Sequence, residues 1–283
     1  MAAPDLGPVL VTGCSSGIGR ATARHLAELG HTVYATARQP DTLTDLVAAG
    51  CRTLALDVTD EGSMRAAVST VEADHGAVGA LVNNAGYSQS GPVEEVTAEA
   101  LRRQFETNVF GPVRLCQLVL PAMRSAGRGR IVNVSSMGGR ITLPGAGASH
   151  ATKYALEAFS DALRYEVAGF GVQVVIVEPG PVHTEFGSTA AVAMGQAADR
   201  GPYGDFKDGV DALMARVYSS EPKGSARPEA VARVIDGALT ARRPRARYLV
   251  GATARSLVGA HAVLPDRVWD RFLATQYPRP PTA

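Results

Sequence analysis

The chain has 283 residues, of which 46% are hydrophobic and 19% charged, and this composition excludes disorder over most of its length. Its 28 basic and 27 acidic residues leave a net charge of +1, which gives no electrostatic basis for binding nucleic acid or an anionic membrane. The length fits two domains or one large α/β domain. We expect a single domain over residues 1–283.

Cysteine content and hydropathy favour a soluble protein of a reducing compartment. The three cysteines form neither a disulfide framework nor a zinc-binding spacing, so we expect no metal and a cytoplasmic location. Residues 1–7 lack the features of a signal peptide. The longest stretch without Asp, Glu, Lys or Arg, 75–93, carries several polar side chains, so we expect no membrane span.

Short apolar runs alternate with segments of helical spacing along the chain. Seven runs predict strands buried on both faces: 9–11, 32–36, 53–56, 80–82, 131–134, 172–177 and 248–250. Helical spacing is found between them, for example at 21–29, 64–75, 101–123 and 155–167. This alternation predicts an α/β fold, a doubly wound Rossmann-type parallel sheet of about seven strands with helices on both faces.

One region interrupts the alternation. Residues 183–227 contain no strand-like run, and glycine and proline recur in them. A long insertion after the carboxyl end of a strand is where α/β folds place substrate lids, so we favour a lid over an ordinary surface loop. We expect the tail after Tyr277, which is rich in proline, to be disordered.

The first predicted strand runs into a glycine-rich turn that precedes a helix. Glycines there let the backbone approach a pyrophosphate closely, and the helix N-terminus offers free amides to the anion. The spacing is Gly-x-x-x-Gly-x-Gly, not the commoner Gly-x-Gly-x-x-Gly, and tight packing alone could also require it. We expect the loop to bind a dinucleotide through Gly13, Ser15, Ser16, Gly17, Ile18 and Gly19.

The end of the second strand indicates which dinucleotide binds. A carboxylate at this point would hold a ribose 2′-hydroxyl and favour NAD, but the sequence has Ala37-Arg38. Arg38 can pair with a 2′-phosphate, and Ser16 can add a hydroxyl contact. An ordinary surface arginine is the alternative in this arginine-rich chain. We favour NADP(H) as the cofactor.

As a set in this order, the motifs resemble the classical short-chain dehydrogenase/reductase family over about residues 9–251. They are the glycine-rich loop at 13–19, Asn83-Asn84-Ala85-Gly86, Asn108, Ser135-Ser136, Lys153 and Pro179-Gly180. The segment 33–38, together with the Cys14-Ser15-Ser16 loop, is similar to family members that act on steroids, retinoids and other bulky alcohols or ketones.

The resemblance implies roles for individual residues. Lys153 would hold the nicotinamide ribose and lower the pKa of a proton donor, Ser136 would hydrogen-bond the reacting oxygen, and Asn108 would help relay protons through a bound water. Cofactor contacts are also implied for Asp57, Val58, Asn84, Ala85, Gly86, Pro179, Gly180, Val182 and Thr184. The alternative for Asn108 is a polar residue inside a helix that hydrogen-bonds only to the backbone. The alternative for Ser136 is a residue that merely caps the end of a strand.

The chain departs from the family at the proton donor itself. The family's catalytic tyrosine lies four residues before the lysine and thirteen after the serine, and both counts lead to Ser149. Tyr154 follows Lys153 directly and points about 100° away around the helix. We expect His150 to lie on the wrong side as well. Because a serine hydroxyl is shorter and far less acidic than a phenol, we expect cofactor binding to survive and turnover to be severely reduced.

The sequence therefore predicts an NADP(H)-dependent oxidoreductase that interconverts a bulky apolar alcohol and its ketone or aldehyde, impaired by Ser149. The substitution is either engineered, which the intact remaining motifs favour, or natural divergence. A catalytically diverged NADP(H)-binding protein, or a non-redox member of the fold, is the alternative function. We expect Met137, Leu143 and Phe186 to contact the substrate beside Ser136, with core packing as the alternative. The resemblance also implies a homodimer or homotetramer paired through long helices.

Overall fold

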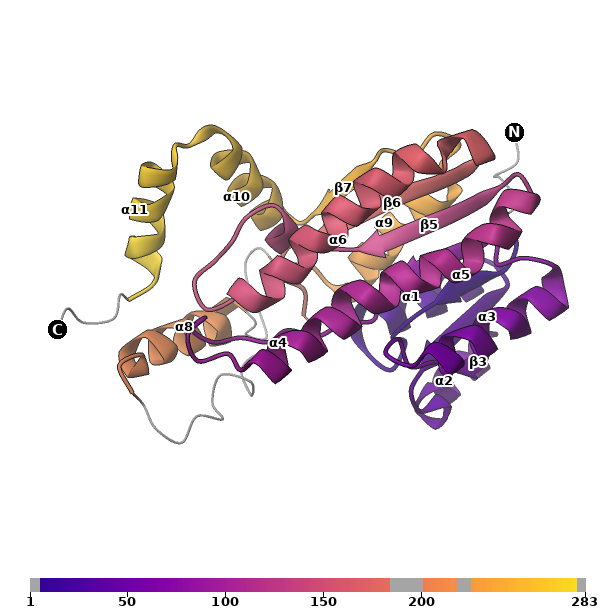
Figure 1. Cartoon of the computed structure of the whole chain (residues 1–283), viewed down its shortest axis with the longest axis horizontal. Coiled ribbons are helices and arrows are strands. Elements are labelled where there is room, and N and C mark those ends of the chain that lie inside the picture. Colours follow the sequence, from indigo (N-terminus) through magenta and orange to yellow (C-terminus); the bar gives the residue numbers. More distant parts are fainter. Residues whose placement is uncertain (1–5, 184–200, 218–224, 279–283) are drawn as a thin grey trace.

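Seven parallel strands form one sheet at the centre of the molecule. The computed structural model describes residues 6–183, 201–217 and 225–278. Within these residues the strand order is β3-β2-β1-β4-β5-β6-β7, and every neighbouring pair is parallel. Helices cover both faces of this sheet (Figure 1). The predicted doubly wound, Rossmann-type fold is therefore confirmed.

The strands lie where the apolar runs predicted them, within one or two residues. Their bounds are β1 Val9–Val11, β2 Val33–Ala37, β3 Arg52–Ala55, β4 Ala80–Asn83, β5 Gly129–Val134, β6 Val172–Pro179 and β7 Arg247–Val250. The inner strands β1, β2 and β4 are buried throughout, whereas β3 at the sheet edge has exposed and half-buried residues. Burial on both faces was thus correct for β1, β2 and β4 and wrong for the edge strands β3 and β7, which keep exposed or half-buried residues.

Two layers of helices pack against the sheet. One face is covered by α1 (Gly17–Glu28) and α9 (Pro228–Thr240), and the other by α3 (Glu61–His75), α5 (Gly111–Ser125) and α6 (Gly147–Glu166). Strand β1 shows how the two cores arise, because successive side chains point to opposite faces. Val9 and Val11 belong to the α1–α9 core, and Leu10 belongs to the other.

Helix starts were placed too late by the apolar spacing. Helix α1 begins at Gly17 and α6 at Gly147, several residues before the periodic apolar positions. The spacing reports only the face that a helix buries, and both first turns are rich in small or polar residues. The segment predicted at 101–123 comprises α4 (Ala98–Phe105), a π-helical turn (Glu106–Phe110) and α5.

The sheet topology determines where a ligand can bind. Chain order reverses between β1 and β4, because β2 and β3 lie on one side of β1 and β4 to β7 on the other. In open α/β sheets the crevice beyond the carboxyl ends of the strands at such a switch point is the usual ligand site. The glycine-rich loop follows β1, and the Asn83-Asn84 motif spans the end of β4, so both lie at this point.

Three helices extend the molecule beyond the carboxyl ends of the strands (Figure 1). They are α8 (Gly204–Val217), α10 (Ala252–Val263) and α11 (Asp266–Gln276). A third apolar cluster joins Met137 and Ile141 to Ala254, Val258 and Trp269 of this C-terminal pair. The expected lid at 183–227 is described only in part, as α8 and the residues beside it, and the expected disordered tail lies largely outside the described residues.

Short helical segments complete the described part of the chain. A 3-10 turn at Pro40–Leu43 leads into α2 (Thr44–Ala48), and further 3-10 turns lie at Met137–Gly139 and Ala168–Phe170. None of the helices in the described ranges combines the length and the apolar character needed to cross a membrane.

Candidate active site

A large cavity, with a volume of about 1110 Å³, opens at the carboxyl ends of the strands. The glycine-rich loop, the end of β2, the β4 loop, β5, the start of α6 and the end of β6 all contribute to its wall. Motifs that are 140 residues apart in the sequence therefore face one space. The arrangement combines an anion-binding loop with a cluster of hydroxyl and ammonium groups.

The glycine-rich loop has the conformation that its glycines allow. Gly13 and Gly17 have φ angles of +70° and +56°, in the left-handed region that favours glycine. A Cβ at Gly19 would lie only 2.2 Å from the carbonyl oxygen of Gly13, so no larger residue fits there. Helix α1 begins in this loop, with Ser16 as its extended N-cap residue. The predicted Gly13, Ser15, Ser16, Gly17 and Ile18 all line the cavity, while Gly19 lies behind them.

Asn84 holds the loop in place from the neighbouring strand. Its side-chain amide donates hydrogen bonds to the carbonyl oxygens of Thr12 and Gly13, at 2.9 and 3.1 Å. The Thr12 hydroxyl in turn accepts hydrogen bonds from the backbone amides of Asn84 and Ala85, both at 3.0 Å. Asn84 also lines the cavity. It therefore shapes the glycine-rich loop, a contribution that the sequence motif did not reveal.

The end of the cavity beside β2 and β3 has the groups expected around an adenosine. Arg38 is exposed and follows β2 directly, and it shares the cavity wall with Ser16. Asp57 and Val58 follow β3 and also line the wall. One oxygen of Asp57 accepts hydrogen bonds from the amide and hydroxyl of Thr59, at 2.9 and 2.8 Å, which fixes the turn. The only charged group at the tip of β2 is thus a guanidinium, which suits a phosphate.

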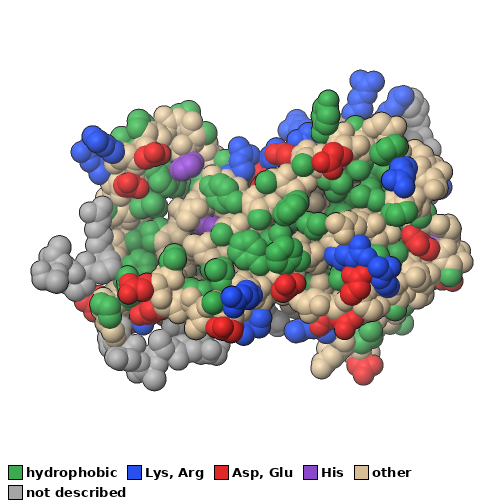
Figure 2. All heavy atoms as spheres, viewed as in Figure 1, with side chains coloured by type: hydrophobic (Ala, Val, Ile, Leu, Met, Phe, Trp, Pro, Cys, Tyr) green, Lys and Arg blue, Asp and Glu red, His purple; other side chains and the backbone are tan. Residues whose placement is uncertain are grey.

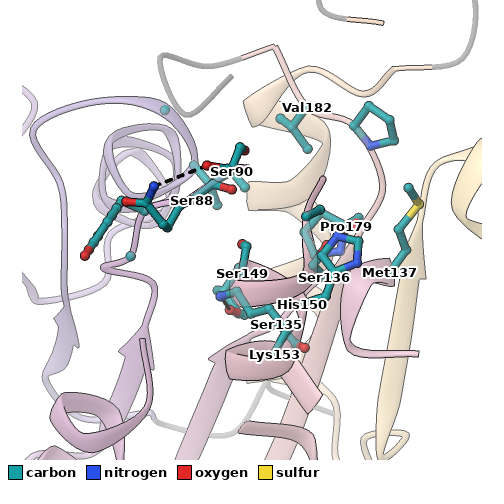
Figure 3. A pocket seen from close by; sticks show the side chains of 18 of the residues that line it. Ser88, Ser90, Ser135, Ser136, Met137, Ser149, His150, Lys153, Pro179 and Val182 are labelled. Carbon is teal, nitrogen blue, oxygen red and sulfur yellow. Dashed lines mark hydrogen bonds between the residues drawn. The ribbon is translucent and has the colours of Figure 1, made fainter. Parts of the chain in front are cut away.

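Ser136, Ser149 and Lys153 meet on the floor of the cavity. The Ser136 hydroxyl accepts a hydrogen bond from the Gly138 amide at 3.0 Å and donates one to the Pro179 carbonyl at 3.4 Å. Ser149 lies in the first turn of α6, one turn before Lys153. Within the described residues its hydroxyl makes no hydrogen bond, and Figure 3 shows it on the floor between Ser88 and Ser136.

Lys153 is a buried cation with one fixed contact. Its Nζ donates a hydrogen bond to the Val134 carbonyl at 2.9 Å, and only 8% of the residue is exposed. Burial lowers the pKa of Lys153 to about 8, and the Glu157 carboxylate opposes this shift. Tyr154, the next residue, is 41% exposed and does not line the cavity. It lies where the helix geometry predicted and cannot replace a proton donor at position 149.

His150 does not lie on the wrong side, and that expectation is corrected. Its ring lines the cavity, and a Cβ at Gly138 would come within 2.6 Å of Nε2 (Figure 3). Nδ1 accepts a hydrogen bond from the Leu143 amide at 3.3 Å. Burial lowers the pKa of His150 to about 4, so the ring is neutral near pH 7. The segment 137–146 folds over the first turn of α6, so a residue 100° from Ser149 still faces the cavity.

Asn108 lies in the π-helical turn behind the cavity wall. Its side-chain oxygen accepts a hydrogen bond from the Tyr87 amide at 3.1 Å. Its side-chain nitrogen donates to the Tyr87 carbonyl at 2.9 Å and to the Thr152 hydroxyl at 3.1 Å. The residue is 1% exposed and does not line the cavity. These contacts match the alternative role for Asn108, a helix residue whose polar atoms are all hydrogen-bonded within the protein. A role for Asn108 in proton relay stays a prediction.

The remaining predicted cofactor and substrate residues fall into two groups. Ala85, Gly86, Pro179, Gly180, Val182, Met137 and Leu143 line the cavity. Thr184 and Phe186 lie outside the described residues. The predicted contacts near the nicotinamide end are therefore brought together where the structure describes them.

The outer wall of the cavity was missed by the sequence reasoning. It is apolar, and it consists of side chains from α8, α10 and α11 and the residue that follows α11: Val210, Leu213, Met214, Val217, Leu257, Phe272, Leu273 and Tyr277. Apolar residues at helical spacing in 252–276 were the available signal. Ser88 and Ser90 were missed as well. The Ser90 hydroxyl is buried with no hydrogen-bond partner among the described residues.

Comparisons with known proteins agree with this geometry. A family model for short chain dehydrogenases matches residues 8–193. The chain is 34% identical to a 3-ketodihydrosphingosine reductase of Bacteroides thetaiotaomicron, over 95% of this chain and 97% of that protein. It is also 34% identical to an NADPH-dependent 3-dehydrocapnine reductase of Ornithobacterium rhinotracheale, over 93% and 94%. A solved short-chain dehydrogenase from Streptomyces avermitilis superposes with a TM-score of 0.79 at 37% identity, covering 94% of each chain.

Proposed function

The chain belongs to the short-chain dehydrogenase family, an oxidoreductase family, and we propose that it binds NADP(H) and interconverts a bulky apolar alcohol and its ketone or aldehyde. The observation that carries this proposal is the cavity, which joins a glycine-rich loop and Arg38 at one end to Ser136 and Lys153 at the other. A reductase of 34% identity is named as NADPH-dependent, which supports the cofactor.

The residues present fit this cofactor. Gly13 and Gly19 let the loop pack closely on itself and on the β4 loop, since a Cβ on either would come within 2.8 Å of backbone atoms. Free amides at the start of α1 suit the pyrophosphate, Arg38 and Ser16 suit the 2′-phosphate, and Lys153 suits the nicotinamide ribose. NADPH held in this way supplies a hydride to the carbonyl carbon of the substrate. Pro179, Gly180 and Val182 lie beside the nicotinamide end of the cavity.

The protein's own residues orient the carbonyl oxygen and provide positive charge near it. The Ser136 hydroxyl points into the cavity and can donate to that oxygen, because its bond to Pro179 is long, at 3.4 Å. The Lys153 ammonium favours the negative charge that develops on the oxygen. A suitable proton donor is missing, since Ser149 occupies the position that a tyrosine occupies in the family. We propose that turnover in this chain is low for that reason.

The substrate class follows from the walls of the cavity. Met137 and Leu143, together with side chains of α8, α10 and α11, form an apolar enclosure beside Ser136. Related reductases act on 3-ketodihydrosphingosine and 3-dehydrocapnine, as their names state. We propose a carbonyl compound or alcohol with a large apolar part, whose polar group meets Ser136.

The expected location and assembly are also proposals. The three cysteines are free and buried, as suits a protein of the reducing cytoplasm. Phe110, Tyr154 and Phe159 are 51%, 41% and 48% exposed, on the face where Figure 2 shows a broad apolar area over α5 and α6. We propose that this face pairs two copies of the chain in a homodimer or homotetramer.

A catalytically diverged NADP(H)-binding protein is the second candidate, and the serine at position 149 is the observation that favours it. One experiment separates the two. NADPH binding is measured by cofactor fluorescence, and NADPH consumption is then followed with a panel of apolar ketones for the parent chain and Ser149→Tyr. Binding with recovered turnover supports the oxidoreductase. Binding without turnover in either form supports the diverged binder, and an absence of NADPH binding contradicts both.

A further inference from the structure

A buried carboxylate lies directly behind Lys153 on the same helix. Glu157 follows Lys153 by four residues, and side chains at this spacing lie on one face of a helix. Only 5% of Glu157 is exposed, and it lies outside the cavity wall. A carboxylate buried to this extent needs a compensating interaction nearby.

Arg247 of β7 supplies part of that compensation. Its Nε donates to Glu157 Oε2 at 2.9 Å and lies 3.3 Å from Glu178 Oε1, and its Nη2 donates to Asp161 at 2.5 Å. Arg140 forms a second ion pair with Glu178, at 3.3 Å. One guanidinium is thus shared among three carboxylates. The charge of Glu157 is held in place by Arg247 but is not fully neutralised by it.

The second oxygen of Glu157 is left without a partner. Within the described residues Glu157 Oε1 is buried and accepts no hydrogen bond, and the same holds for the Ser135 hydroxyl. Both atoms lie against Gly139, where a Cβ would be 3.2 Å from Oε1 and 2.8 Å from the hydroxyl oxygen. A buried carboxylate with one uncompensated oxygen acts strongly on any cation close to it, because the surroundings screen its charge poorly.

The nearest such cation on α6 is Lys153, and the two groups act on each other without touching. Within the described ranges they form no direct ion pair, and the hydrogen bond that Lys153 Nζ makes there goes to a backbone carbonyl. The carboxylate of Glu157 raises the pKa of Lys153 against the larger effect of burial. The other charged groups around this pair are Glu178, Arg140, Arg247 and Asp161, and His150 is neutral near pH 7.

We propose that Glu157 is a positioning residue that keeps the Lys153 ammonium charged inside the cavity. The proposal deepens the proposed function and rests on it for its consequence, since a charged Lys153 is what would bind the nicotinamide ribose and stabilise negative charge on the substrate oxygen. The physical reason is simple. A lysine that is buried tends to lose its proton, and a carboxylate one turn away reverses part of that tendency.

Lysine titration by NMR tests the proposal directly. The chain has three lysines, Lys153, Lys207 and Lys223, so a protein labelled with ¹³C at the lysine ε-carbon gives three signals. Lys153→Arg assigns the signal of Lys153. In Glu157→Gln, which keeps the shape of the side chain, we expect the Lys153 midpoint to fall by about one pH unit or more. Glu178→Gln is the matched control, because it removes another buried carboxylate that does not neighbour Lys153 on α6. The Lys153 midpoint in this variant should stay near that of the parent.

The outcomes are distinct. An unchanged midpoint in Glu157→Gln, or an equal fall in Glu178→Gln, would overturn the proposal, and Glu157→Asp, which retains the charge, should recover most of the parent midpoint. If Glu157→Gln does not fold, Glu157→Met with Arg247→Met removes both partners. Loss of the Arg247 cation by itself can only raise the midpoint of Lys153. A lower Lys153 midpoint in the double variant therefore still supports the proposal, and an unchanged or higher midpoint contradicts it. Since the titration needs neither cofactor nor turnover, its result is independent of whether the proposed oxidoreductase activity is found.

Discussion

Ser149 and Lys153 lie one turn apart at the start of α6, and both side chains line the same cavity. Lys153 holds a fixed position through its bond to the Val134 carbonyl, whereas the Ser149 hydroxyl is unbonded within the described residues. The site thus keeps the cation and has a short, weakly acidic group where the proton should be delivered. This relationship sets the first prediction.

We expect Ser149→Tyr to raise NADPH-dependent reduction of a bulky apolar ketone by about 10²-fold or more, because a positioned general acid is worth about 10²–10⁴-fold in rate. NADPH affinity should change little, since the loop and Arg38 lie at the other end of the cavity. Steady-state rates with several ketones measure the effect. Ser149→Phe is the control, since it adds the same volume without the hydroxyl. A parent chain that is as fast as Ser149→Tyr would show that another group supplies the proton.

Arg38 should decide between the two nicotinamide cofactors. It is exposed at the tip of β2, beside Ser16, and no carboxylate is found at Ala37. We expect the parent to bind NADPH more tightly than NADH, and Arg38→Ala to lose about 1.5–3 kcal/mol of NADPH binding alone. Fluorescence titration of both cofactors measures this. Arg102→Ala, an exposed arginine outside the cavity, should leave both affinities unchanged, and equal affinities in the parent would refute the assignment.

The glycine-rich loop should not tolerate a side chain at position 19. A Cβ there would overlap the Gly13 carbonyl and the Asn84 amide, at 2.2 and 2.4 Å, so Gly19→Ala should cost about 1–3 kcal/mol in stability and abolish NADPH binding. Gly237→Ala is the matched control. Its Cβ would meet nothing within 4 Å in the middle of α9, so it should stabilise the protein by about 0.5–1 kcal/mol. Urea unfolding without cofactor measures the change in stability, and the same experiment with NADPH measures whether the variant still binds it.

Helix α8 should depend on a contact with the segment that precedes α4. Lys207 is 7% exposed and its Nζ lies 3.0 Å from Glu95, while Tyr203 donates to Glu94 at 2.6 Å. Lys207→Met should speed amide exchange in α8 by about tenfold, since the loss of a partly buried charge-assisted bond costs at least about 1.4 kcal/mol. It should also raise the KM for bulky ketones, because α8 forms a cavity wall.

Hydrogen exchange measured by mass spectrometry over residues 203–217 tests whether amide exchange in α8 is faster in Lys207→Met. Ala212→Ser changes an exposed position of the same helix and should alter neither exchange nor KM. If Lys207→Met exchanges no faster than the parent, the contact with Glu95 does not hold α8. Slower exchange on addition of substrate would support the predicted lid, at least for the part of 183–227 that the structure describes.

His150 should make the fold sensitive to acid. In the folded chain its pKa is about 4, whereas the ordinary value is 6.5, so between these values the unfolded chain binds the additional proton. Stability should therefore fall as the pH falls from 6.5 to 4, by about 1–3 kcal/mol from this group. Urea unfolding at pH 7 and pH 4.5 measures the slope. His150→Asn should reduce it, whereas His31→Asn, outside the cavity, should not, and an unchanged slope in His150→Asn would contradict the low pKa.

The sequence by itself determined the features that depend on neighbouring residues. Short apolar runs placed all seven strands, because a strand buried by the sheet needs apolar side chains along its whole length. Motif spacing placed Ser136, Ser149 and Lys153 at the family's motif positions, and the helix geometry excluded Tyr154 as a replacement for the catalytic tyrosine. The position of β1 and β4 on either side of the switch point then made the glycine-rich loop and the Asn84 motif neighbours, as their place at strand ends indicated.

Only the tertiary structure decided which distant residues share the site. His150 faces the cavity because residues 137–146 fold over the start of α6, and the outer wall exists because α8, α10 and α11 return to it from later in the chain. Glu157 and Arg247 are 90 residues apart in the sequence and meet because α6 packs against β6, which pairs with β7. Local periodicity records which face of an element is buried. It contains no information about the partner that buries it.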